Sequence, residues 1–175
     1  MHIPTHILSG WCASNLFQLS ARERLFCMIA ASVEDVDGLG RIVSEELYWS
    51  LHHKLGHCAL FGVAISSLLA AFSKRRLTCF LLYIALFHVH LVLDAFGSGP
   101  GWSIYYVWPF SDWEFNTEWA WEFFSWQNIT AFTLLLGWML WIAKRQHRTP
   151  LELIAPRLNQ QFVRAITSTP AASPD

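Results

Sequence analysis

Charged side chains are scarce in this chain. Asp, Glu, Lys and Arg make up 14% of its 175 residues, whereas a soluble domain usually carries about a quarter. Apolar residues account for 54%, aromatic residues for 15%, and the mean hydropathy is +0.32. The chain lacks the polar surface that a water-soluble domain of this length needs, so we expect lipid to be its solvent.

Other absences exclude further classes. The cysteines show no Cys-x-x-Cys spacing, which argues against a zinc ribbon or a disulfide framework and predicts small buried side chains. With a net charge of -1 and no recurring basic face, the sequence predicts no nucleic-acid partner. Residues 1–10 lack the basic segment of a signal peptide, so we expect the spanning helices themselves to target the chain to a membrane.

Three apolar stretches predict transmembrane helices. Residues 77–96 contain no Lys, Arg or Glu and are long enough to cross a hydrocarbon core of about 30 Å. Residues 58–73 and 123–143 are slightly short or polar at one end but are predicted to span as well. Residues 7–19 and 25–33 are too short to cross separately and form either a hairpin dipping into the membrane, the preferred interpretation, or short packed helices. The predicted fold class is an all-α polytopic membrane protein with three spans and an N-terminal hairpin.

The basic residues predict the orientation. They concentrate in residues 74–76, between two predicted spans, and in residues 144–148, after the last one, so the positive-inside rule places both segments in the cytoplasm. Acidic residues concentrate in the opposite connections, residues 34–46 and 94–122. We therefore expect a membrane-embedded domain over residues 1–148, followed by a flexible cytoplasmic tail over residues 149–175, which is rich in Pro, Ala, Ser and Thr.

The predicted orientation of the spans places several histidines and aspartates on the non-cytoplasmic face of the membrane. Ionisable groups beside hydrocarbon are costly, so their recurrence there indicates a functional site. Imidazoles and carboxylates are typical ligands of divalent metals. The candidate ligands are His6, Asp35, His52, His57, His90 and Asp94. The alternative is a solvated acidic surface with incidental histidines.

The strongest local signal is the pair His90 and Asp94. Four residues apart in a helical pattern, they project from one face and can bind one metal, or His90 can bind one ion and Asp94 a second. His88 points nearly the opposite way, so we interpret it as a packed or helix-bridging residue.

Two further segments offer ligands with less certain geometry. Helical spacing favours His53 as the partner of His57, whereas His52 requires a loop before the helix, and spacing alone does not choose between them. Asp35 and Asp37, followed by a glycine, suit either a divalent cation or the local hydrogen bonds of a turn.

Four blocks of the sequence resemble one family, the bacterial inner-membrane metal-dependent hydrolases of the YbcI/YdjM type, also called LexA-binding inner-membrane-associated hydrolases. The similar blocks are Thr5-His6 with Gly10, residues 35–38, residues 52–58, and residues 90–94 followed by Trp108-Pro109-Phe110. The chain departs from the family at Glu34, where proline is usual, and the third block is the most altered, with His53, Lys54, Gly56 and Cys58 in place of Arg, Gly, Thr and Ser. No feature of the sequence supports a LexA partnership.

The resemblance implies a membrane-bound hydrolase that uses one or two divalent metal ions, with zinc expected and manganese or iron as alternatives. It favours His52 over His53 as a ligand. Asp37 is either a further ligand or the base that orients the water, and Glu34 is a second candidate for a catalytic role. Glu45, Glu46 and Asp112 are candidate hydrogen-bond acceptors for the ligating histidines.

The expected partners are the lipid bilayer of the bacterial inner membrane and a small-molecule or lipid substrate, such as a phosphodiester, at the non-cytoplasmic face. The aromatic segment over residues 102–126 predicts an interfacial belt, with a ligand-stacking surface as the alternative. Two other functions stay open, namely a small ion or metal transporter and an inactive protein stabilised by a metal. Turnover that consumes water distinguishes the hydrolase from both, and vectorial uptake into liposomes identifies a transporter.

We predict that detergent-purified protein carries roughly one or two equivalents of zinc, manganese or iron. The His90→Ala and Asp94→Ala variants should each lose the metal, because each removes a ligand from the strongest local pair. Elemental mass spectrometry checks this prediction. Three equally folded proteins without metal would contradict it.

Overall fold

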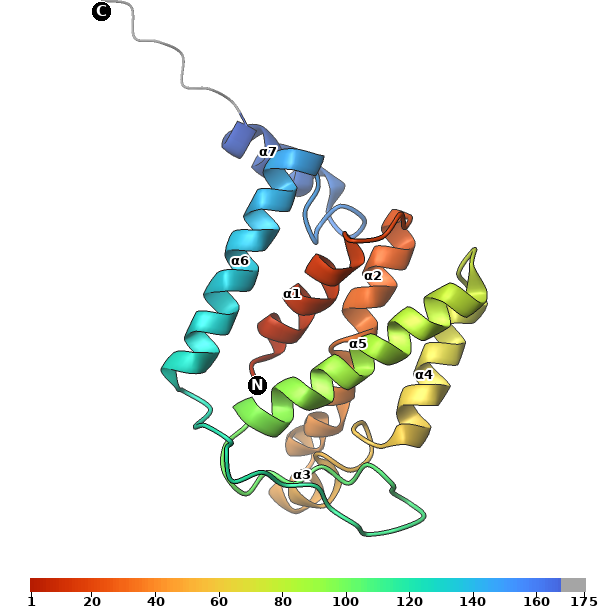
Figure 1. Ribbon diagram of the computed structural model, residues 1–175, viewed down its shortest axis with the longest axis vertical. Helices are drawn as coiled ribbons and strands as arrows, with labels where there is room; N and C mark the ends of the chain where they lie inside the picture. The colour runs from red at the N-terminus through yellow and green to blue at the C-terminus, as the bar shows by residue number, and fades with distance from the viewer. Residues whose placement is uncertain (168–175) are drawn as a thin grey trace, which may run out of the picture.

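Helices and their connecting loops make up the chain. The computed structural model describes residues 1–167, and Figure 1 shows its helices in chain order. They are α1 (Ile3–Ser14), α2 (Ala21–Ala30), the 3-10 helix η1 (Val33–Ile42), α3 (Glu45–Leu51), α4 (Ala59–Ala71), α5 (Arg76–Gly97), α6 (Trp126–Gln146) and α7 (Pro156–Thr167). In these residues the only β-type pairing is an isolated bridge between Ile104 and Phe115, so the predicted all-α class is confirmed.

The predicted N-terminal helices form a hairpin, α1 and α2. A capping box starts α2: the Ser20 hydroxyl accepts a hydrogen bond from the Glu23 N–H at 3.3 Å, and the Glu23 carboxylate accepts one from the Ser20 N–H at 2.8 Å. Helix α1 packs against α6, and α2 packs against α5. The hairpin is therefore also a packed part of the bundle, and its entry into a membrane stays a prediction.

Close approach of α1 and α2 depends on Gly10. A Cβ at this position would lie 2.5 Å from the carbonyl oxygen of Cys27 and 2.9 Å from the Cβ of Ala31. Small residues allow helix backbones to approach in this way, which is the common solution for helix packing in membranes.

Helix α5 packs mainly against α4 and α2. Its buried residues Cys79, Tyr83 and Leu86 pack against small residues of α2 and against the C-terminal half of α4. The Tyr83 hydroxyl shares a 2.9 Å hydrogen bond with the Ser73 hydroxyl, which satisfies a polar group inside the core. All four cysteines are free and buried, as the sequence predicts.

The prediction of three spanning helices is corrected to one. Only α5, with 22 residues and a mean hydropathy of 2.0 over its most apolar window, is long and apolar enough to cross a membrane among the described residues. Helix α4 has 13 residues and rises about 20 Å, less than the hydrocarbon thickness of about 30 Å. Helix α6 has 21 residues but carries polar side chains in its first turn and at its basic C-terminal end. The predicted span over residues 58–73 is thus wrong because its helix is too short. The predicted span over residues 123–143 is wrong because its helix is polar at both ends.

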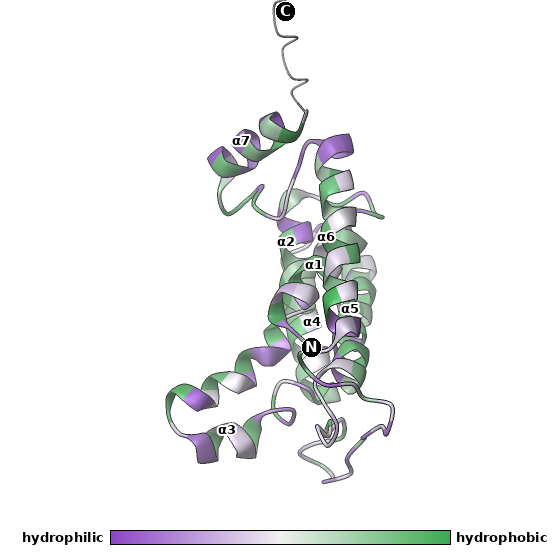
Figure 2. Ribbon diagram, turned by 90° about the vertical axis from the view of Figure 1, so that its left-hand side faces the viewer, coloured by the Kyte–Doolittle hydropathy of each residue, from purple (hydrophilic) through white to green (hydrophobic). Residues whose placement is uncertain are grey.

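The two ends of the bundle differ in chemistry. The α1–α2 and α4–α5 turns lie together at one end, where the Glu23 carboxylate accepts a 3.0 Å hydrogen bond from the N–H of Lys74 (Figure 1). The N-terminus, α3 and the C-terminal end of α5 lie at the opposite end. Figure 2 shows apolar residues along α4 and α5 and hydrophilic residues at the end of α6 and in α3. This separation agrees with the predicted charge distribution, while the cytoplasmic placement of the basic end stays a prediction.

Part of the predicted tail is helical. Arg24 pairs with Glu152 at 2.6 and 2.8 Å, and Asn159 of α7 accepts a 2.7 Å hydrogen bond from the N–H of Thr149. The Arg24–Glu152 ion pair connects the predicted tail to α2, and the hydrogen bond between Thr149 and Asn159 connects two parts of the tail to each other. Residues 168–175 lie outside the described residues, so the division at residue 148 stays a prediction.

Replacing Gly10 with alanine should destabilise the protein by about 1–3 kcal/mol, because the new methyl group overlaps a backbone carbonyl that has no room to move. Gly137→Ala in α6 is the matched control: no atom lies within 4 Å of its Cβ position, and alanine favours a helix by about 0.5–1 kcal/mol. Thermal unfolding followed by circular dichroism in detergent measures both. Equal melting temperatures would refute the close contact.

Candidate metal centre

Four segments bring ionisable side chains together beside the C-terminal end of α5. These segments are α1, η1, the α3–α4 connection and α5 itself, which come from different parts of the chain but meet at this end of the bundle (Figure 1). The residues are His6 from α1; Glu34, Asp35 and Asp37 from η1; His52, His53 and His57 from the connection; and His90 and Asp94 from α5. The structure thus gathers every predicted ligand in one region.

Three donor atoms form a nearly equilateral triangle. Asp94 Oδ2 lies 3.2 Å from His57 Nε2 and 3.1 Å from His90 Nε2, and the two nitrogens are 3.2 Å apart. A tetrahedral zinc ion with bonds of about 2.0–2.1 Å separates its ligand atoms by about 3.3 Å. The triangle therefore has the dimensions of one face of a tetrahedral site.

Asp35 adds a fourth donor. Its Oδ1 lies 3.9 Å from His90 Nε2, and one ligand atom from each of Asp35, His57, His90 and Asp94 lies within 4.8 Å of the others. Two imidazoles and two carboxylates are a donor set suited to zinc, manganese or iron. These four residues fit a divalent metal ion.

The ring orientations support this assignment. His57 Nδ1 lies 3.0 Å from Asp37 Oδ2, and His90 Nδ1 lies 3.0 Å from the carbonyl oxygen of Ala31. When Nδ1 donates to such an acceptor, the lone pair of Nε2 points to the centre, as in most metal-bound histidines. The acceptors are thus Asp37 and a backbone carbonyl, whereas the predicted acceptors Glu45, Glu46 and Asp112 are exposed.

Asp37 positions the connection before α4. Its Oδ1 lies 2.7 Å from His52 Nδ1, and its Oδ2 also accepts a 3.1 Å hydrogen bond from the N–H of Gly56. Burial opposes ionisation, but His52 and His57 outweigh it and hold the pKa of Asp37 well below its usual value. A Cβ at Gly56 would lie 2.0 Å from the carbonyl oxygen of Glu34, so glycine lets the connection reach η1. Both Asp37 oxygens are thus engaged in hydrogen bonds.

The centre attracts positive charge. Burial alone lowers the pKa of His57, but hydrogen bonds to the Asp37 and Asp94 carboxylates outweigh this effect and raise the pKa to about 10. In the metal-free protein, a proton on His57 offsets part of the carboxylate charge. A divalent cation supplies more positive charge at the same place, so metal binding and release of this proton are coupled.

The structure places His53 nearer to the centre than His52. His53 is buried, its Nε2 lies 4.0 Å from Asp94 Oδ2, and its ring stacks on that of His57 with centroids 4.4 Å apart. It adopts a left-handed backbone conformation with φ of 63°, which is uncommon outside glycine. The partly exposed His52 contacts Asp37 instead. The four-residue spacing of His53 and His57 carried this signal, although the connection is not a regular helix.

His6 approaches the centre from the other side of Asp94. Its Nε2 lies 3.0 Å from Asp94 Oδ1, and its ring centroid is 3.9 Å from that of His90. Asp94 thus presents Oδ2 to His57 and His90, and Oδ1 to His6 and to the buried N-terminal amino group of Met1, which a second ion at Oδ1 would have to displace. This arrangement is compatible with one ion or with two ions that share the carboxylate.

Glu34 lies behind His90. Its side chain is fully buried, its Oε2 is 3.7 Å from His90 Nδ1, and neither oxygen has a hydrogen-bond partner among the described residues. Burial raises its pKa to about 8, so the carboxyl group is mainly protonated at neutral pH.

His88 lies outside the centre, as predicted. It is exposed on α5, with Nδ1 2.7 Å from the carbonyl oxygen of Ile84 and Nε2 2.9 Å from the hydroxyl of Tyr106. The residue bridges α5 to the loop that follows it.

A cavity of about 290 Å³ opens beside the centre. Its lining includes Asp35, Arg41, His53, Asp94 and Trp102. The Trp102 ring stacks on Trp49 and contacts the His53 ring at 5.1 Å between centroids. Other tryptophans of the predicted aromatic segment, Trp113, Trp119 and Trp126, are exposed. The aromatic segment thus forms part of the cavity wall through Trp102, while these other rings are exposed on the surface.

Together these features define a class: a small protein that over residues 1–167 is all-helical, with one membrane-length apolar helix and a buried histidine–aspartate cluster at the end of that helix. The family model described as YdjM inner membrane protein matches residues 1–159. The chain belongs to this family, which confirms the resemblance of the sequence blocks and places the protein in the membrane. No curated protein and no solved structure gives a significant match to the chain.

Asp37→Asn should weaken metal binding about 10–100-fold, because the amide no longer orients His57 as a carboxylate does. Asp112→Asn, at an exposed loop position, is the matched control and should leave affinity unchanged. Titration of metal-stripped protein with zinc, followed calorimetrically, gives both affinities. Equal affinity in the two variants would show that Asp37 does not support the centre.

Proposed function

We propose that this protein is a membrane-bound, metal-dependent hydrolase whose site lies at the non-cytoplasmic face. The observation that carries the proposal is the triangle of His57 Nε2, His90 Nε2 and Asp94 Oδ2, with sides of 3.1–3.2 Å. The family assignment supports the membrane location. The orientation follows the positive-inside rule, because α5 begins at Arg76, the last of the basic residues 74–76.

His57, His90 and Asp94 would hold the ion and leave one position of a tetrahedral site open for water. Asp35, whose Oδ1 lies farther away, 3.9 Å from His90 Nε2, would face that water, and His6 would serve as a ligand if a second ion binds. A bound divalent ion of this kind lowers the pKa of its water to about 7 and provides hydroxide at neutral pH. Zinc suits the donor set, and manganese or iron are alternatives. His52 supports the centre through Asp37 in this proposal.

Asp35 is the carboxylate best placed to accept a proton from the attacking water. It lines the cavity, and its Oδ2 has no hydrogen-bond partner in residues 1–167. The two residues that the sequence offers for this role are less suited: both oxygens of Asp37 are hydrogen-bonded, and Glu34 lies on the Nδ1 side of His90. We therefore assign Asp37 to positioning, and Glu34 to the support of His90.

The cavity favours a substrate with a negative charge and an apolar part. Arg41 is the cationic side chain in its lining, and the Tyr48, Trp102 and Phe123 rings provide apolar walls. A guanidinium binds phosphate oxygens through charge-assisted hydrogen bonds. These features support cleavage of a phosphodiester, including one carried by a lipid.

The metal-loaded protein should hydrolyse bis(p-nitrophenyl) phosphate, a soluble phosphodiester. Chelation should abolish turnover and zinc should restore it. His90→Ala should lower kcat at least about 100-fold through loss of a metal ligand, while His88→Ala on the same helix serves as the control with unchanged kcat. Release of p-nitrophenol measures the rates. Metal-loaded protein without turnover on this or on phospholipid substrates would leave a structural or transport role.

Arg41→Gln should raise KM about tenfold with little change in kcat, because the guanidinium binds the phosphate without contacting the reacting centre. The same assay measures this effect. An unchanged KM would remove Arg41 from substrate recognition.

A further inference from the structure

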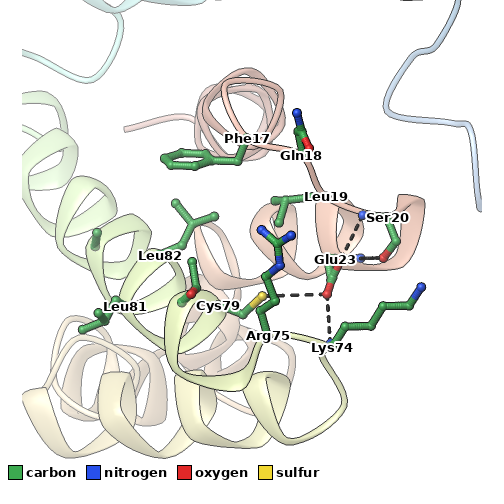
Figure 3. A pocket seen from close by; sticks show the side chains of 12 residues that line it. Phe17, Gln18, Leu19, Ser20, Glu23, Lys74, Arg75, Cys79, Leu81 and Leu82 are labelled. Carbon is green, nitrogen blue, oxygen red and sulfur yellow. Dashed lines mark hydrogen bonds between the residues drawn. The ribbon is translucent and has the colours of Figure 1, made fainter.

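A second cavity lies at the opposite end of α5, away from the metal centre. Its volume is about 660 Å³, and it lies between the α1–α2 turn and the first turns of α5. Such a volume is typical of small-molecule sites. Figure 3 shows Phe17 and Leu82 facing each other across it, with Leu19 and Leu81 nearby. The lining is mostly apolar in its interior and basic at one edge.

The basic edge is formed by Lys74 and Arg75. Both side chains are exposed and line the cavity, and Figure 3 shows the Arg75 guanidinium pointing toward the α1–α2 turn. Neither side chain forms an ion pair with the carboxylates that the structure describes. Two cations are thus available beside an apolar space.

Glu23, the acidic residue in the lining, forms no ion pair with these cations. Its carboxylate is buried and accepts hydrogen bonds from the N–H and hydroxyl of Ser20 at 2.8 and 2.7 Å and from the N–H of Lys74 at 3.0 Å. The carboxylate is satisfied by neutral donors, and its role is to join the two turns. The positive end of the α5 helix dipole lies at the same place and adds to the attraction for an anion.

The apolar part of the cavity continues onto the uncovered face of α5. Leu77, Leu81, Val89 and Val92 follow one another at helical spacing and are 72%, 56%, 42% and 57% exposed. In an inner membrane protein with α5 as the spanning helix, this face lies against acyl chains. The cavity then sits at the level where the hydrocarbon meets the headgroups.

We propose that this cavity binds an anionic phospholipid, with the phosphate on Lys74 and Arg75 and one acyl chain along Leu81, Leu82 and Ala85. Basic pockets beside spanning helices are suited to anionic headgroups, and the chain contact distinguishes a lipid from free phosphate. The lipid would hold the α1–α2 and α4–α5 turns together. This site is independent of the metal centre and of the proposed hydrolysis.

Native mass spectrometry of the full chain in detergent tests the charge contact. Wild-type protein should retain phosphatidylglycerol in preference to phosphatidylcholine with the same acyl chains. Lys74→Gln/Arg75→Gln should weaken phosphatidylglycerol binding about 30-fold, since each basic residue near an anionic lipid contributes about fivefold. Lys144→Gln/Arg145→Gln, an exposed basic pair at the end of α6, is the control and should bind like wild type. Equal retention of the two lipids, or equal loss in the control, would overturn the proposal.

A second pair of variants tests the chain contact. Ala85→Trp fills the cavity from an exposed position of α5 and should remove lipid binding, whereas Val92→Trp lies on the same helix outside the cavity and should not. Excess inorganic phosphate should displace little phosphatidylglycerol, because it lacks the acyl chain. Retention by Ala85→Trp, or full displacement by phosphate, would refute a lipid site. Circular dichroism confirms folding, and if the double variant fails to fold, Arg75→Gln and Ala85→Trp decide.

Discussion

The structure depends on the burial of one carboxylate, that of Asp94, near the C-terminal end of an apolar helix. A buried charge is costly unless it is paired and hydrogen-bonded. His6, His57 and His90 supply these contacts from α1, from the α3–α4 connection and from α5 itself. The need to satisfy Asp94 therefore fixes how three distant segments meet. A divalent metal ion bound to Asp94 would also pair its buried carboxylate, with a larger positive charge than a protonated histidine.

Close backbone contacts make this convergence feasible. Gly10 allows α1 to approach α2, and Gly56 allows the α3–α4 connection to approach η1. The carbonyl oxygen of Ala31, at the end of α2, then reaches His90. Packing and polar chemistry thus depend on each other: without the small residues, the acceptors that orient the imidazoles would lie too far away.

The two ends of α5 carry opposite chemistry. At one end carboxylates and imidazoles form a centre that attracts cations, and at the other Lys74 and Arg75 border an apolar cavity. Such polarity is expected of a helix that crosses a membrane, since charged groups are excluded from the hydrocarbon and gather at its two surfaces. The family assignment to an inner membrane protein agrees with it.

Several features were readable from the sequence because they are local. Composition indicates lipid as the solvent, and the spacing of His90 and Asp94 places both on one helix face. The prediction for residues 77–96 agrees with α5, which among residues 1–167 is the helix long and apolar enough to cross a membrane. The spanning prediction was wrong for residues 58–73 and 123–143, because hydropathy alone does not show where a helix begins and ends: α4 covers only Ala59–Ala71, and α6 runs from Trp126 to Gln146, so that polar residues occupy both of its ends.

The tertiary structure alone decided the roles within the cluster. His53 reaches the centre through a left-handed backbone conformation in an irregular connection, and Asp37 reaches His57 because the 3-10 helix η1 packs beside that connection. The acceptors of His57 and His90 lie 20 and 59 residues away in the chain. The sequence by itself determines the residue types and the segments that form helices. Which imidazole faces which carboxylate is decided by long-range packing, because distances between distant segments are set only when the bundle closes.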